Sequence, residues 1–151
     1  MNYNEFKKNA LNFYVENYMF SKIKNKNYIY KEYNDFYFII YIVKSNFDNH
    51  YKILSNYYFK ELHKISELIS PDNCDELIHT DLQQPEDLFN EQLINSKSDD
   101  EIFYLLDKIF KKLDQNFTKN GLNHIYKIQS NKTLYTFKPS ARNYLLRKIN
   151  K

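Results

Sequence analysis

The chain has 151 residues and a net charge of +3, and 42% of its residues are hydrophobic and 18% aromatic. About 150 residues is the size of one domain and is long enough to bury a core, so we expect a single folded domain over residues 1–151. The only glycine is Gly121. One glycine excludes phosphate-cradling loops and dinucleotide-binding fingerprints, because both need several residues without a β-carbon.

The cysteine content and the first residues favour a cytoplasmic protein. Cys74 is the only cysteine, so no intrachain disulfide can form. Residues 1–13 carry charged and polar side chains where a signal peptide has an apolar run. The longest apolar stretch, residues 36–43, is far shorter than the roughly 20 residues that span a bilayer. We therefore expect no membrane partner.

The first element in chain order is an amphipathic helix. Apolar residues recur at helical spacing at Tyr3, Phe6, Ala10 and Phe13. Asn2 or Asn4 can cap the helix, which we expect to reach about residue 18.

Three segments rich in aromatic and β-branched residues follow, at 28–30, 36–43 and 51–59. Asn and Asp at 33–35 and 46–49 separate them and favour tight turns. The pattern predicts a three-stranded antiparallel meander. The middle segment is apolar at both odd and even positions, so both faces of a strand formed by it would be apolar. We therefore expect it to be the central strand and to be covered on both faces.

The segment after the meander is the hardest to assign. Residues 62–69 suggest a short helix or a strand extension. Residues 71–97 are acidic and poorly periodic, so we interpret them as a long loop with a short helix after Pro85.

A long helix over residues 98–119 has the strongest signals in the chain. Ser98 and Glu101 form a capping box at its start, and Gly121 stands where a C-terminal cap is expected. Six apolar residues share one face of this helix: Ile102, Leu105, Leu106, Ile109, Leu113 and Phe117. From this pattern and the central strand we predict that Ile40, Leu106 and Ile109 are buried.

In the C-terminal part, the residue pattern predicts a hairpin of residues 125–129 and 134–137. A basic helix that starts at Pro139 is expected to follow it. The expected fold class is therefore α+β: an antiparallel sheet packed by the N-terminal helix and the 98–119 helix.

We predict no catalytic constellation, no metal and no cofactor. Cys74, His79 and Asp81 are close in the sequence, but their spacing matches no zinc pattern. A nucleophilic Cys74 with His79 as its base is disfavoured, because neighbouring acids raise the pKa of a thiol. His63 and Glu67, four residues apart, are typical of a weak surface contact.

Acidic residues are concentrated between residues 72 and 107, with eleven carboxylates against a single lysine. Unpaired charges are costly to bury, so we expect this region to be exposed and to contribute to a protein contact. The residues predicted to bind the partner are Asp81, Glu86, Asp87 and Glu91. The alternative is a solvated insertion without a role.

A second function is suggested by Lys22, Lys24, Lys26, Tyr28 and Tyr30, which alternate and would share one face of a strand. Lysines beside stackable rings are typical of a platform for single-stranded nucleic acid, and the basic last helix could add to it. The alternative is an edge strand that its lysines protect from pairing with other sheets.

Three short segments resemble a group of small bacterial domains of unknown function. They are Met19-Phe-Ser-Lys22, Tyr28-Ile-Tyr-Lys31 and Val43-Lys-Ser45. The similarity covers about the first sixty residues, although the usual Gly and Gln of the group are absent. Some members are thought to be immunity proteins of polymorphic toxins. The resemblance implies a non-catalytic module that binds a protein partner such as a toxin, with nucleic-acid binding as the alternative function.

Overall fold

The computed structural model describes residues 2–44, 51–70, 80–89, 98–130 and 136–149, and its fold class is α+β, as predicted. The helices are α1 (Tyr3–Tyr18), α2 (Ile65–Ile69), α4 (Asp99–Asn120), α5 (Leu122–Ser130) and α6 (Pro139–Ile149). The strands are β1 (Ser21–Lys22), β2 (Tyr28–Glu32), β3 (Phe36–Lys44), β4 (Tyr51–Phe59) and β5 (Glu86–Phe89).

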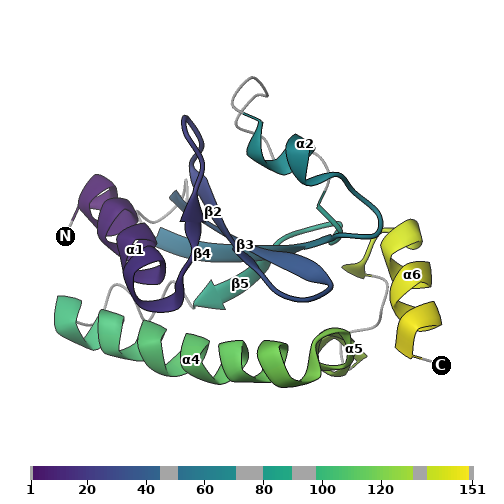
Figure 1. The fold of residues 1–151 in the computed structure, drawn as a ribbon. Helices are drawn as coiled ribbons and strands as arrows, with labels where there is room; N and C mark the ends of the chain where they lie inside the picture. The colour runs from purple at the N-terminus through teal and green to yellow at the C-terminus, as the bar shows by residue number, and fades with distance from the viewer. Residues whose placement is uncertain (1, 45–50, 71–79, 90–97, 131–135, 150–151) are drawn as a thin grey trace.

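The strands form one antiparallel sheet in the order β1-β2-β3-β4-β5 (Figure 1). The predicted meander is confirmed as β2, β3 and β4. Ile40 of β3 pairs with Ile29 of β2 and with Ser55 of β4, so β3 is the central strand. Its residues Phe36, Phe38, Ile40 and Ile42 are buried on one face, whereas on the other face Ile39 is buried and Tyr37, Tyr41 and Val43 are half-buried.

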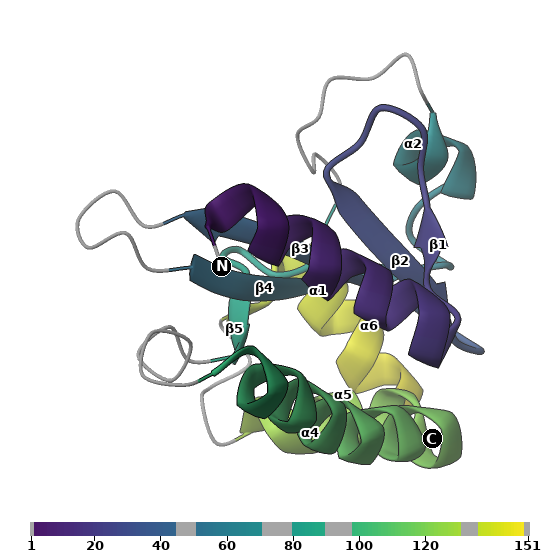
Figure 2. The same cartoon turned by 90° about the vertical axis from the view of Figure 1, so that its left-hand side faces the viewer.

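The two faces of the sheet differ in composition. One face carries Phe36, Phe38, Ile40 and Ile42 of β3 and packs with residues of α1, α4, α5 and α6 in the main core. The other face carries a smaller cluster that includes Ile39 and packs with residues of α2. Figures 1 and 2 show α2 on the opposite side of the sheet from α4.

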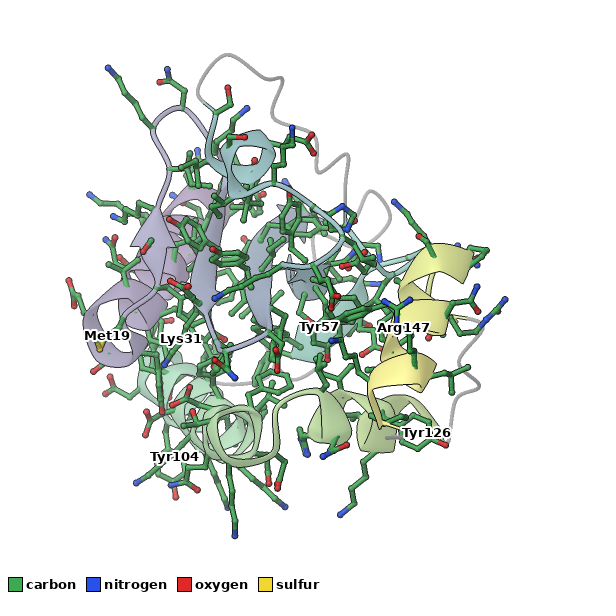
Figure 3. All side chains as sticks on the ribbon, turned by 45° about the vertical axis from the view of Figure 1, so that its right-hand side comes forward. Met19, Lys31, Tyr57, Tyr104, Tyr126 and Arg147 are labelled. Carbon is green, nitrogen blue, oxygen red and sulfur yellow. The ribbon has the colours of Figure 1, made fainter. Side chains whose placement is uncertain are left out.

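Aromatic rings fill the main core. The rings of Phe38 and Phe117 have centroids 5.1 Å apart, and Tyr57 lies within 6.0 Å of Phe117. Tilted and edge-on contacts of this kind add to the stabilisation that burial provides. In Figure 3, Tyr57 lies in the interior between the sheet and the helices, whereas Met19 and Tyr104 point outward.

The ends of the two longest helices follow the predicted capping signals. The Asn2 side chain accepts a hydrogen bond from the Glu5 N–H at the start of α1. At α4 the Ser98 hydroxyl accepts from the Glu101 N–H. Gly121 follows α4 with φ of +54°, and its N–H donates to the Phe117 carbonyl. The predicted helices at the N-terminus and at 98–119 are thus confirmed, as is the start of the last helix at Pro139.

Polar contacts fasten α4 to the sheet and to α1. Lys31 of β2 pairs with Asp114 of α4 at 2.8 Å, and the hydroxyl of Tyr33 donates to the same carboxylate at 2.7 Å. The hydroxyl of Tyr18 donates to Asp107 at 2.6 Å. These contacts complement the aromatic packing below them.

The predicted core is correct at two of three positions. Ile40 and Leu106 are buried, whereas Ile109 is 39% exposed, so the prediction for Ile109 is wrong. The buried stripe of α4 runs through Ile102, Leu106, Phe110 and Phe117. Ile109 lies on the flank of this stripe.

Two predicted elements have the wrong type. The helix expected after Pro85 is strand β5, which pairs with β4. The first arm of the predicted hairpin, at 125–129, belongs to helix α5. Residues 134–135 of its second arm lie outside the described residues, and Phe137 forms only an isolated bridge with Leu82. Within the described ranges, no helix is both long and apolar enough to cross a bilayer.

Candidate functional site

The residues predicted to bind a partner do not share one environment. Asp87 is exposed on β5 and Glu86 beside it is half-buried. Asp81 is only 1% exposed, so the prediction that it faces water is wrong. Glu91 lies outside the described residues, as do Asp72, Asp75 and Glu76 of the acidic region.

Asp81 is buried because its carboxylate has specific partners. Oδ2 accepts the Phe59 N–H at 2.6 Å, and Oδ1 lies 2.6 Å from Nε2 of His63. Burial raises the pKa of the Asp81 carboxyl, although the hydrogen bonds from His63 and from the Phe59 N–H act in the opposite direction. The sequence suggested only a weak surface contact between His63 and Glu67, which stays a prediction. The contact of His63 with Asp81, 18 residues away, is signalled by no helical or strand spacing.

The short segment of residues 80–83, which we name the strap, joins β4 to the start of α6. Its Asp81 N–H donates to the Tyr57 carbonyl at 2.9 Å, and its Asp81 carbonyl accepts the Lys138 N–H at 2.8 Å. Gln83 donates through its N–H to the Thr136 carbonyl at 2.7 Å. The strap therefore holds residues distant in sequence in one place.

Asn56 of β4 faces the strap and is 1% exposed. Its Oδ1 accepts the N–H of Tyr57 at 2.7 Å and the N–H of Leu82 at 3.0 Å. Two backbone donors need an oxygen, so the orientation of the amide group is fixed and Nδ2 must be the donor. Nδ2 has no acceptor in the part of the chain that the structure describes.

A pocket of about 480 Å³ lies between α1, β3 and the strap. This is within the size range of small-molecule sites, about 300–1,000 Å³. Its described lining comprises Tyr3, Lys7, Asn27, Tyr28, Tyr41, Ile42, Val43, Asn56, Thr80, Leu82, Gln83, Pro85 and Lys138. The sequence carries no motif for this pocket, because its described lining comes from six separate segments.

The residues predicted for a nucleic-acid platform do not share a strand face. Lys22 belongs to β1, and the chain then turns at Lys24 and Asn25, which has φ of +65°. Tyr28 is buried on β2, where its hydroxyl donates to the Leu68 carbonyl at 2.9 Å. The turn breaks the alternation, so the predicted single strand of Lys22, Lys24, Lys26, Tyr28 and Tyr30 is wrong.

No group of three or more His, Cys, Asp or Glu side chains among the described residues could hold a metal ion. Cys74 and His79 lie outside these residues. The expectations of no metal and no cysteine nucleophile at that position therefore stay predictions.

No family model matches the sequence, and neither the curated proteins nor the solved structures include a similar chain. The resemblance to immunity-type domains therefore stays a prediction.

Proposed function

We propose that the protein is a non-catalytic protein-binding module of the immunity-protein type, and that it binds a basic protein partner through β5. The observation that supports this is the position of Glu86 and Asp87, on a strand at the edge of the sheet. Asp87 is exposed there and has no ion-pair partner among the described residues. A toxin is the kind of partner that the family resemblance suggests.

An edge strand is a common site for protein recognition, because an extended segment of a partner can add to the sheet through backbone hydrogen bonds. Among the described strands, β5 pairs with β4 alone. Its acidic side chains oppose pairing between two copies of this edge and attract a partner strand that carries lysine or arginine.

The first turn of α4 supplies further negative charge after β5. Asp99, Asp100 and Glu101 are all exposed. Carboxylates at this place also stabilise the helix, because they face the positive end of its dipole. Their location is therefore explained in part by the helix alone, and the proposal rests on β5.

The test is a charge reversal, Asp87→Lys, with Glu16→Lys on the exposed face of α1 as the matched control. A partner recovered with the wild-type protein is identified, purified and used for kinetics at low and at physiological salt. We expect Asp87→Lys to slow association by about tenfold at low salt and to reduce its salt dependence. Glu16→Lys should change the rate much less.

Equal rates for the two variants, with native circular dichroism spectra, would exclude β5 as the binding surface. The alternative function, nucleic-acid binding, loses the shared strand face from which it was predicted. Salt-sensitive binding of a labelled single-stranded oligonucleotide, weakened by Arg147→Ala in α6, would favour that alternative instead.

A further inference from the structure

The pocket beside the strap contains buried hydrogen-bond donors without acceptors. Nδ2 of Asn56 is one, and the hydroxyl of Thr80 is another buried group with no hydrogen-bond partner in the described part of the chain. Buried polar groups are nearly always paired, and leaving a donor unpaired costs about 1–3 kcal/mol. Both residues line the same pocket, which points to an acceptor that binds there.

The charge of the pocket lining has one sign. Lys7 and Lys138 are its cations, and its described lining includes no Asp or Glu. Lys7 donates to the Asn27 side chain at 2.8 Å. The Lys138 ammonium has no ion-pair partner among the described residues. The carboxylate of the nearby Asp81 is already bound by Phe59 and His63.

Much of the remaining lining comes from apolar and aromatic residues. They are Tyr28, Tyr41, Ile42, Val43, Leu82 and Pro85. Tyr41 is half-buried, and burial raises the pKa of its hydroxyl, so this group is a neutral donor at physiological pH.

We propose that this pocket binds a small organic carboxylate with an apolar or aromatic body. The carboxylate accepts hydrogen bonds from Asn56 and Thr80 and pairs with Lys138, while its body packs against the tyrosine rings. Lys7, Lys138 and the two neutral donors can hold an anionic group, and the aromatic and apolar residues of the lining favour a ligand with an organic body over inorganic phosphate. This site is separate from β5, so the two proposals can fail independently.

The first experiment uses 3-phenylpropanoate as the probe and its neutral analogue 3-phenylpropanamide as the control. Titration into ¹⁵N-labelled protein is followed at the side-chain amide signals of Asn56. We expect saturable shifts with the carboxylate and at least about tenfold weaker binding of the amide, which corresponds to about 1.4 kcal/mol. Inorganic phosphate is titrated in parallel.

Asn56→Asp is the most informative variant. Its carboxylate keeps an oxygen for the N–H groups of Tyr57 and Leu82, but it replaces the Nδ2 donor with a second, negatively charged oxygen. We expect the Asn56→Asp variant to bind 3-phenylpropanoate at least tenfold more weakly than the wild-type protein does. Lys138→Met should also weaken binding about tenfold, whereas Lys108→Met on the exposed face of α4 is the matched control and should not.

If Asn56→Asp does not fold, Thr80→Val and Lys138→Met test the same contacts. The proposal is overturned if 3-phenylpropanoate leaves the Asn56 signals unchanged, or if the amide binds as tightly as the carboxylate. It is also overturned if Lys138→Met and Lys108→Met bind equally, or if phosphate alone saturates the site.

Discussion

Asp81 shows how a side chain expected at the surface becomes part of the interior. An unpaired charge is costly to bury, but this carboxylate receives the Phe59 N–H and the His63 imidazole. The partners lie 22 and 18 residues away. The charge of an aspartate predicted that Asp81 would be exposed. Only the fold brings the Phe59 N–H and His63 close enough to offset the cost of burying it.

The energetic role of Asp81 is tested by comparing Asp81→Asn with Asp81→Ala. Asparagine keeps an acceptor for the Phe59 N–H, whereas alanine leaves that buried donor unpaired. We therefore expect Asp81→Ala to lower the free energy of unfolding by about 1–3 kcal/mol more than Asp81→Asn. Urea denaturation at neutral pH measures both values, and equal costs would contradict the assigned role of the hydrogen bond.

The same residue predicts a pH dependence. Burial raises the pKa of the folded Asp81 above its ordinary value of 3.8, so the folded protein holds this proton more tightly than the unfolded chain. The stabilisation that results is complete below that ordinary value and is lost as the pH rises through the folded pKa. The stability of Asp81→Asn relative to wild type should therefore increase between about pH 3 and about pH 7. A difference that stays constant over this range would contradict the direction of the shift.

Leu106 and Ile109 form a matched pair on α4. Leu106 is buried, so Leu106→Ala should lower the free energy of unfolding by about 2–5 kcal/mol. Ile109 is 39% exposed, and Ile109→Ala should cost less than about 1 kcal/mol. Chemical denaturation of both variants checks the helix face, and a larger effect at Ile109 would show that it is assigned wrongly.

At the scale of the element, the ends of α4 depend on two residues with different roles. Ser98→Ala removes the acceptor for the Glu101 N–H and should cost about 0.5–2 kcal/mol. Gly121→Ala meets no crowding, since the nearest atom to an added Cβ is 3.9 Å away. Its φ of +54° with ψ of −125° is instead a conformation that suits only glycine, and the strain should cost about 1–3 kcal/mol.

Thermal and urea unfolding of the two α4 variants separates these effects. Ser98→Asp should restore most of the stability lost in Ser98→Ala, because aspartate is an equally good cap. No such rescue is available at Gly121. If Gly121→Ala is as stable as wild type, the positive φ is not required to end the helix.

Strong periodicity made α1, the meander and α4 predictable. β5 was missed because Glu86–Phe89 has no strand pattern of its own and is ordered by pairing with β4. The apolar residues of 125–129 fit the spacing of a strand as well as that of a helix, and in the folded protein this segment is part of helix α5. The pocket could not be foreseen, since Asn56 and Lys138 have no sequence relation. The partner-binding prediction retains Asp87 but not Asp81, because burial is a property of the fold.

At the scale of the whole molecule, the two faces of the sheet differ in hydroxyl content. β3 directs Phe36 and Phe38 to the main core, while Tyr37 and Tyr41 lie on the side of α2. Phe38 is buried, so its replacement by tyrosine would bury a hydroxyl without a hydrogen-bond partner.

We therefore expect Phe38→Tyr to cost about 1–3 kcal/mol. Tyr37→Phe on the opposite face should change the free energy of unfolding by less than about 0.5 kcal/mol, because that ring is half-exposed. Equal responses to these two one-atom changes in denaturation experiments would contradict the assignment of the faces.

The strap has a consequence for how the protein opens. Because Asp81 contacts β4 through Tyr57 and Phe59 and contacts the start of α6 through Lys138, the C-terminal helix cannot detach without disturbing the sheet. The amide protons of Phe59, Leu82 and Lys138 should thus exchange with solvent through one cooperative opening, with similar protection. Native-state hydrogen exchange would show this, and Asp81→Ala should accelerate all three amides together.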